Sequence, residues 1–184
     1  MTLLDKIKEK YAQHPEMPYI SPERNLAAWL EEVDTSSNKL VPKRNMIRLD
    51  GGYLPGHIII LWRVQFGTYT NETVISKYFE YKYGIDAKKE MDTLIQDGYV
   101  IELGALESLE FQTAGQLKNY LKNKGIHGLS KMTKAQLVEA IQEHFPEEEL
   151  GELFTIRKYK LTNKGEKLLT KYPEIIDKHP KKKF

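Results

Sequence analysis

Lysines gather between residues 105 and 145 in a pattern that suits binding to phosphate groups. The five lysines there stand against four glutamates, but the glutamates lie at the outer ends, so the centre is basic. Lys131 and Lys134 flank the expected start of a helix, where unpaired backbone amides and the helix dipole favour an anion. A preceding helix adds three further cations, namely Lys118, Lys122 and Lys124. This arrangement indicates contact with the backbone of a nucleic acid.

Two short amphipathic helices must position these lysines. In the first, Leu117 and Leu121 share one face, and Gly125 stands where a left-handed residue is wanted at the C-terminal end. The second helix begins after Thr133, whose hydroxyl can cap the backbone while Gln136 reaches back to it. The sequence therefore predicts a helix on each side of a short connection.

The connection between the two helices carries apolar residues of its own. Ile126, Leu129 and Met132 recur at every third position, which predicts an extended segment laid across both helices rather than a third helix. Thr113 and Gln116 offer the first helix the same capping pair. The predicted unit is helix, extended segment, helix.

The order and spacing of seven residues in this unit resemble the SAP motif and the wider helix-extended-helix group: Leu117, Leu121, Gly125, Ile126, Lys134, Leu137 and Ile141. The segment from Leu129 to Ile141 is similar to the N-terminal domain of the transcription terminator Rho. SAP sequences usually carry a Gly-Lys pair where this chain has Met132 and Thr133. The resemblance implies binding to DNA, or to RNA for the Rho branch. The alternative is a generic helical hairpin whose lysines only form a solvated face.

The flanking sequence has the outline of a winged helix-turn-helix. Helices are predicted at residues 57–66, at residues 70–83 with Thr70 as the cap, and after Asp86. A strand is predicted at residues 99–103, and a second wing strand follows much later at residues 154–161. The helix-extended-helix unit would then be an insertion in the wing.

The end of the second predicted strand carries a recognisable pattern. Its YKLTNKGEKLL resembles the Y-x-L-T-x-x-G-x-x-L ending of many winged-helix regulators, in which the threonine caps a closing helix. The resemblance assigns that role to Thr162 and turns Tyr159 and Leu161 to the core. A folded insert at a hairpin tip costs little beyond closing the hairpin, so an insertion between Leu103 and Leu153 is acceptable.

We therefore expect a mainly α (α+β) fold, a winged helix-turn-helix with a small helix-extended-helix module inserted in the wing. Four parts are predicted: an N-terminal helical arm and loop (1–52), a winged-helix-like domain (53–103 plus 153–172), a SAP-like insert with an acidic linker (104–152) and a basic tail (173–184). The linker holds Glu147, Glu148 and Glu149, which are expected in water.

Smaller expectations concern the N-terminal half. Ser21, followed by proline and glutamate, predicts a helix start, and Trp29 lies on the apolar stripe of that helix. Residues 40–49 are expected to include a short strand. Trp62 belongs to a strongly apolar helix and is predicted to be buried.

Two further groups of cations could reach a nucleic acid. The second wing strand carries Arg157, Lys158 and Lys160, which suit a backbone clamp or, alternatively, a charged edge that discourages strand pairing. The third helix offers Lys88 and Lys89, but four carboxylates outnumber them and would repel a duplex: Asp86, Glu90, Asp92 and Asp97. The predicted contact set is Lys118, Lys122, Lys124, Lys131, Thr133, Lys134, Arg157, Lys158, Lys160, Lys88 and Lys89.

Composition narrows the class of protein. The 184 residues carry a net charge of only +2, so a nucleic-acid surface must be local. The chain has no cysteine, and its five histidines are scattered, so we predict no metal site. It lacks a phosphate loop and a nucleophile motif, so we expect no enzyme, no cofactor and no small-molecule substrate. The longest apolar run, Ile58 to Trp62, is too short for a bilayer, so we expect a soluble cytoplasmic protein.

These observations predict a non-enzymatic DNA-binding protein, a regulator of transcription or of a mobile element, which holds the DNA backbone largely through the SAP-like module. One alternative is a protein-interaction adaptor whose winged helix forms a homodimer or docks on a partner. Another is binding to RNA or to single-stranded nucleic acid.

Overall fold

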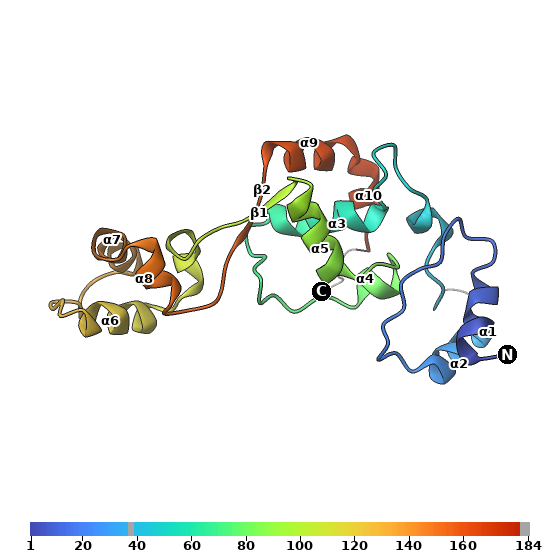
Figure 1. Ribbon diagram of the computed structural model, residues 1–184, viewed down its shortest axis with the longest axis horizontal. Helices are drawn as coiled ribbons and strands as arrows, with labels where there is room; N and C mark the ends of the chain where they lie inside the picture. The colour runs from blue at the N-terminus through green and yellow to red at the C-terminus, as the bar shows by residue number, and fades with distance from the viewer. Residues whose placement is uncertain (37–38, 181–184) are drawn as a thin grey trace. The chain divides into compact units, whose positions relative to one another are not determined.

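Helices dominate the computed structural model of the chain, which describes residues 1–36 and 39–180 (Figure 1). The helices within these residues are α1 (Leu3–Lys10), α2 (Leu26–Thr35), α3 (Pro55–Gln65), α4 (Tyr78–Tyr81), α5 (Ala87–Gln96), α6 (Ala114–Asn123), α7 (Lys134–His144), α8 (Glu147–Gly151), α9 (Asn163–Lys171) and α10 (Pro173–Asp177), with the 3-10 helices η2 (Lys43–Met46) and η3 (Leu106–Phe111). Strands β1 (Val100–Glu102) and β2 (Tyr159–Leu161) pair in a small antiparallel sheet. The predicted mainly α (α+β) class is confirmed.

The chain divides into two compact units. Unit 1 comprises residues 1–66, 74–100 and the described residues from Leu161 onward, and unit 2 comprises residues 67–73 and 101–160. This division differs from the four predicted parts, because the N-terminal segment shares a unit with α3. Of the predicted basic tail, residues 173–177 form α10, and residues 181–184 lie outside the described part.

The N-terminal segment of unit 1 folds around a small apolar contact between α1 and α2. Ile7 is fully buried, and Trp29 is buried as predicted. The predicted helix start at Ser21 is wrong, because Asn25 is the residue whose side chain accepts the Ala28 N–H at 3.0 Å. The strand expected within residues 40–49 is also wrong, since η2 forms there directly after Pro42.

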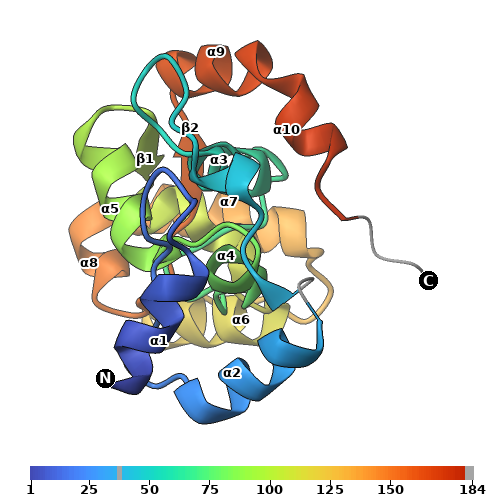
Figure 2. The ribbon, with the colours of Figure 1, turned by 90° about the vertical axis from the view of Figure 1, so that its right-hand side faces the viewer.

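Helix α3 is the centre of unit 1. Its residues Ile58 to Leu61 are fully buried, and the helix packs against α5, α9, α10 and η2. Figure 2 shows α9 and α10 following one another in the chain. The helix predicted at 57–66 is confirmed to within two residues, but Trp62 is half-buried rather than buried. An all-round apolar helix of this kind needs neighbours on every side, which explains its central position.

The long helix predicted at 70–83 is wrong, because only α4 forms there. Thr70 caps no helix. Its N–H donates to the Thr73 hydroxyl at 2.8 Å, and the residue pairs with Lys158 in an antiparallel bridge within unit 2. The Asn71 side chain adds a bond to the Arg157 N–H at 2.7 Å. Pairing with a segment that is distant in the sequence, just before β2, has therefore overridden the local helical pattern.

The short sheet and α9 follow the predicted pattern closely. The strands are shorter than expected, and Tyr159 and Leu161 are buried as predicted. The Thr162 hydroxyl accepts the Gly165 N–H at 3.1 Å and donates to the Gly98 carbonyl at 2.6 Å, so the predicted cap of the closing helix is confirmed. At the other helix of this region, Asp86 caps α5 as predicted.

Unit 2 contains the predicted helix, extended segment and helix. Helices α6 and α7 pack together through Leu117, Leu121, Leu137 and Ile141, which are fully buried. Both predicted capping boxes form, and Gly125 has a φ of +85° at the end of α6. The extended segment lies against this core through three partly buried side chains, Ile126, Leu129 and Met132.

The acidic linker predicted after α7 is wrong. Residues 147–151 form α8, and two of its three glutamates have fixed partners within unit 2. The Glu147 carboxylate accepts the N–H groups of Ala105 and Leu106, the latter at 2.9 Å. Glu149 forms an ion pair with Lys124 at 2.8 Å. The segment is therefore a short helix that packs against η3, while its three glutamates are exposed to water as predicted.

His179 predicts a pH dependence for unit 1. It lies in an aromatic cluster with Trp62, Tyr78 and Tyr83, and its Nδ1 accepts the Tyr83 hydroxyl at 2.5 Å. Burial, and secondarily the Arg63 guanidinium, lower the pKa of His179 below its ordinary value. Because the unfolded chain takes up the proton at a higher pH than the folded chain, neutral His179 stabilises unit 1. This contribution to the free energy of unfolding is fully present above about pH 6.5 and is lost as the pH falls through the folded-state pKa.

Urea unfolding monitored by tryptophan fluorescence checks this, since both tryptophans, Trp29 and Trp62, lie in unit 1. The unfolding midpoint should drop between pH 7.5 and pH 5.5, and His179→Phe should reduce that drop. An equal drop in the variant and the parent would assign the pH dependence to other groups.

Candidate nucleic-acid interface

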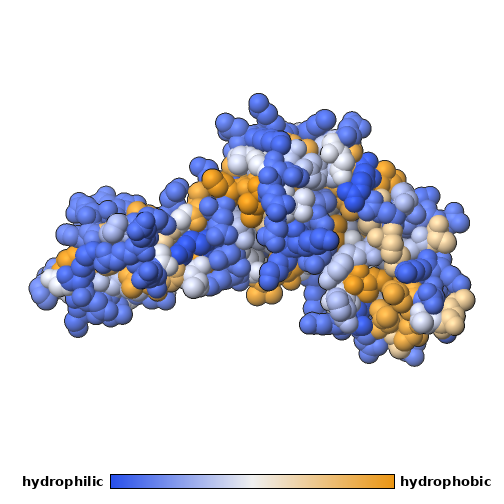
Figure 3. Space-filling view, viewed as in Figure 1, coloured by the Kyte–Doolittle hydropathy of each residue, from blue (hydrophilic) through white to orange (hydrophobic). Residues whose placement is uncertain are grey.

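The basic centre of unit 2 is free of carboxylates along the sequence. From Thr113 to Val138 the chain carries five lysines and no acidic residue, and this run forms α6, the extended segment and the start of α7. Figure 3 shows mostly hydrophilic side chains over α6 and α7 on the face in view. Helix α6, the extended segment and the first residues of α7 thus carry only positive charge.

Lys118 and Lys122 stand one turn apart on α6. They follow the buried residues Leu117 and Leu121, so the core contact of α6 fixes the side of the helix from which they project. Among the described residues neither lysine has a hydrogen-bond or ion-pair partner. Two unpaired ammonium groups are therefore available at this helix face.

Lys131 is the third unpaired cation, and it lies in the extended segment just before α7. Its side chain is exposed and has no ion-pair partner among the residues that the structure describes. The Thr133 hydroxyl, in contrast, accepts the Gln136 N–H at 3.2 Å. Thr133 therefore fixes the start of α7 first, and its contact with a phosphate stays a prediction.

Lys124 has a structural role. Its ammonium donates to the His144 carbonyl at 2.5 Å, pairs with Glu149 at 2.8 Å and lies 4.3 Å from the centre of the Phe145 ring. These contacts tie the end of α6 to the end of α7 and to α8. Lys124 is thus already engaged within unit 2.

Lys134 and Lys158 both reach Glu110. The Lys134 ammonium donates to the Glu110 carbonyl at 2.8 Å, and the Lys158 ammonium pairs with the Glu110 carboxylate at 2.6 Å. The pairing of Glu110 with these lysines cannot be predicted from the sequence, because Glu110 lies 24 residues from one lysine and 48 from the other. Only the folded position of η3 brings it to them.

Of the three cations predicted to clamp the DNA backbone, only Lys160 is left without a partner among the described residues. Arg157 donates to the carbonyls of Gly151, Phe154 and Ile156 at 2.8 to 2.9 Å, so its guanidinium holds the loop before β2. Lys160 is exposed on β2 and has no ion-pair partner in the described part of the chain. Of these two, Lys160 alone projects freely.

The carboxylates on and around α5 are mostly occupied. Glu90 pairs with the buried His57 at 2.6 Å, Asp97 accepts the Tyr53 hydroxyl at 2.6 Å, and Asp86 caps the helix. The expectation that these groups face a duplex is therefore wrong for Glu90, whose side chain is 24% exposed. These three carboxylates therefore already have hydrogen-bond or ion-pair partners within unit 1.

Lys88 and Lys89 are exposed on α5, where Asp92 is also exposed. Neither lysine has a side-chain partner among the described residues. The outward face of α5 is thus close to neutral rather than acidic. It is a secondary candidate for contact with DNA.

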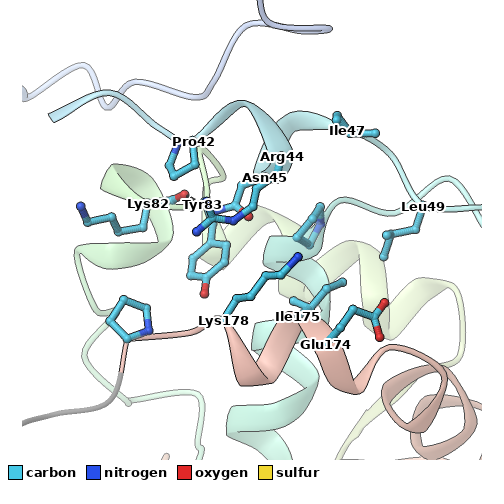
Figure 4. Close-up of a pocket in the computed structure, with 12 residues that line it drawn as sticks. Pro42, Arg44, Asn45, Ile47, Leu49, Lys82, Tyr83, Glu174, Ile175 and Lys178 are labelled. Carbon is cyan, nitrogen blue, oxygen red and sulfur yellow. Dashed lines mark hydrogen bonds between the residues drawn. The ribbon is translucent and has the colours of Figure 1, made fainter. Parts of the chain in front are cut away.

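A separate pocket lies in unit 1 (Figure 4). It has a volume of about 230 Å³, and its lining includes the cations Arg44 and Lys178, the carboxylate Glu174 and the apolar side chains of Ile47 and Ile175. None of the predicted contact residues lines it.

No three His, Asp or Glu side chains gather in a metal-binding group within residues 1–36 and 39–180. In the same part of the chain, none of the helices has the length and apolar character that crossing a membrane requires.

Comparison with family models, with curated proteins and with solved structures found no match.

Proposed function

We propose that this chain is a non-enzymatic DNA-binding protein that holds the phosphate backbone through unit 2. The observation that carries the proposal is the group of three unpaired lysines, Lys118, Lys122 and Lys131, on a run of chain without acidic residues. Such a group attracts a polyanion without reading its sequence. Unit 2 then acts as a SAP-like module, and the protein serves as a regulator of transcription or of a mobile element.

The order of elements in the chain supports a winged-helix scaffold. Helices α3, α4 and α5 precede β1, and β2 leads directly into the capped helix α9. Gly84, with a φ of +60°, makes the tight turn between α4 and α5. Nearly all of unit 2 lies between β1 and β2 in the sequence, as an insertion in a wing requires.

The aromatic residues of unit 2 favour duplex DNA over single strands. An unpaired base is usually held by stacking on an exposed aromatic ring. Among the described residues of unit 2, no such ring is exposed: Tyr69, Phe145 and Tyr159 are buried, and Phe111, Tyr120 and Phe154 are half-buried. Tyr120 and Phe154 stack on one another, with ring centres 6.2 Å apart. Contact through cations alone suits the regular phosphates of a duplex.

Replacing Lys118, Lys122 and Lys131 together with glutamine should weaken binding to duplex DNA. The dependence of log affinity on log salt should flatten by about 0.9 for each lost phosphate contact, hence by roughly 2.7 in all. Fluorescence anisotropy with a labelled duplex at several salt concentrations measures this slope. A control with Lys6, Lys8 and Lys43 replaced in unit 1 makes the same change in net charge.

An unchanged slope in the unit 2 variant would remove these lysines from the interface. Equal losses in the variant and its control would show that net charge alone is responsible. Replacement of Lys88 and Lys89 tests α5 separately. A larger loss of DNA affinity in that variant than in the unit 2 variant would make α5 the principal DNA-binding element. Competition by single-stranded DNA and by RNA identifies the nucleic acid, and stronger competition by RNA would favour the RNA-binding alternative.

The second candidate function is protein interaction. Unit 1 exposes Phe66, Val74 and Ile75, and Val74 is 88% exposed. Exposed apolar side chains of this size can mark a docking or dimerisation surface. Light scattering with and without DNA separates the two functions, since a dimer without DNA affinity at low salt would favour the adaptor.

A further inference from the structure

Glu110 lies where two lysines of unit 2 converge. The Lys158 ammonium is 2.6 Å from its carboxylate, and the Lys134 ammonium is 2.8 Å from its carbonyl oxygen. One residue therefore supplies both acceptors. The three residues come from η3, α7 and the approach to β2, so the convergence arises only in the folded unit.

The positions of the two lysines are well fixed. The Lys158 N–H donates to the Ser108 hydroxyl at 2.9 Å, and Lys158 pairs with Thr70 in the antiparallel bridge. Lys134 is the first residue of α7, directly after its cap Thr133. Both ammonium groups thus belong to defined backbone positions and not to a mobile tail.

Glu110 itself is held less firmly. Its side chain is 53% exposed, whereas that of Lys158 is 22% exposed. An ion pair with so much contact with water is weak, because solvent screens the charges and holding both side chains costs entropy. The Glu110 side chain can therefore rotate into water at small cost and leave the Lys158 ammonium behind.

We infer that Lys134 and Lys158 form a phosphate-binding site in which the Glu110 carboxylate takes the place of a DNA phosphate until DNA arrives. Carboxylate and phosphodiester oxygens are both anionic acceptors at similar distances from an ammonium group. Lys134 has three N–H donors, so it keeps the Glu110 carbonyl while donating to a phosphate. This inference rests on the proposed DNA-binding function and adds a second contact point to it.

The exchange makes binding selective for a high local concentration of phosphate. A free phosphate ion must displace the Glu110 carboxylate without help from any other contact to the protein. A DNA duplex that is already held by Lys118, Lys122 and Lys131 presents its next phosphate at a high effective concentration. Competition by the Glu110 carboxylate therefore favours binding of a DNA duplex over binding of a free phosphate ion.

Glu110→Gln tests the inference. The amide removes the competing charge, so the affinity for duplex DNA should rise about 1.4- to 5-fold at moderate salt, as the weakness of an exposed ion pair implies. The slope of log affinity against log salt should stay close to that of the parent protein, because the Lys158 ammonium contacts a phosphate in both complexes and only the competing carboxylate differs. Glu107→Gln is the matched control, because Glu107 is an exposed glutamate of the same 3-10 helix with no lysine partner among the described residues.

The outcomes separate the inference from the function that it rests on. Binding by the parent protein with equal affinities in the two glutamine variants would overturn the role of Glu110 alone. Absence of salt-dependent binding in the parent and in both variants would overturn the DNA-binding function as well. As a second measurement on the unaltered protein, the NMR signal of the Lys158 ammonium should change when duplex DNA is added, and an unchanged signal would also overturn the inference.

Discussion

Replacing Gly165 with alanine should lower the free energy of unfolding of unit 1 by about 3 kcal/mol, at the upper end of the usual cost of overpacking. A Cβ at this position would overlap with the carbonyl oxygen of Tyr99, which is a backbone atom and cannot rotate away. The same oxygen accepts the Thr162 N–H at 3.1 Å, so α9 cannot move outward without losing that bond. Glycine is therefore required where α9 crosses the chain leading into β1.

Urea unfolding followed by tryptophan fluorescence measures this cost. Gly115→Ala is the control, since Gly115 lies in α6 and an added Cβ would come no closer than 3.9 Å to the nearest side-chain atom. Alanine favours the helix by up to about 1 kcal/mol relative to glycine, so this control, followed by circular dichroism, should be neutral or stabilising. A Gly165→Ala protein as stable as its parent would show that α9 does not approach Tyr99 so closely.

Features that depend on neighbours in the sequence could be predicted from the sequence. The caps at Thr113, Thr133 and Thr162 act over three residues, and each forms as expected. The left-handed turn at Gly125 is equally local. A cap needs only a short polar side chain and the first free amides of a helix, so its signal survives in almost any fold.

Features that depend on partners far away in the chain could not be predicted from the sequence. The turn after Thr70 exists because Asn71 binds residues near Arg157, and no local pattern shows that pairing. Glu147 was expected in a linker, yet it begins α8, and its carboxylate accepts the N–H groups of Ala105 and Leu106. In each case a contact across much of the sequence outweighs a weak local preference.

The same distinction divides the predicted contact residues. The sequence shows which side chains are cationic but not which cations are already used. Lys124 and Arg157 stabilise unit 2 through carbonyl groups, whereas Lys118 and Lys122 have no partner among the described residues. The lysines that are left unpaired are the ones that a phosphate can engage without breaking the fold, and they therefore carry the proposed function.

His57 joins two helices of unit 1 through both of its ring nitrogens. The side chain is 3% exposed. Its Nδ1 accepts the Leu54 N–H at 3.0 Å, which leaves the ring proton on Nε2, and Nε2 donates to the Glu90 carboxylate at 2.6 Å. One nitrogen thus fixes the start of α3 and the other holds α5 against it.

His57→Ala should lower the free energy of unfolding of unit 1 by about 3 kcal/mol. The variant loses a hydrogen bond to a charged group, leaves the Leu54 amide without its acceptor and opens a cavity in the core. Glu90→Gln is the milder comparison, because the amide oxygen still accepts from Nε2, and it should cost about 1 kcal/mol. Tryptophan fluorescence in urea reports both values.

A double-mutant cycle shows whether the pair acts as a unit. The double variant His57→Ala with Glu90→Ala should lose less free energy of unfolding than the sum of the losses in His57→Ala alone and Glu90→Ala alone. Each single change already breaks the contact between α3 and α5. Strict additivity would mean that Glu90 contributes nothing through His57. In that case the Glu90 carboxylate would be free to turn outward, and the outer face of α5 would regain the negative charge that disfavours DNA.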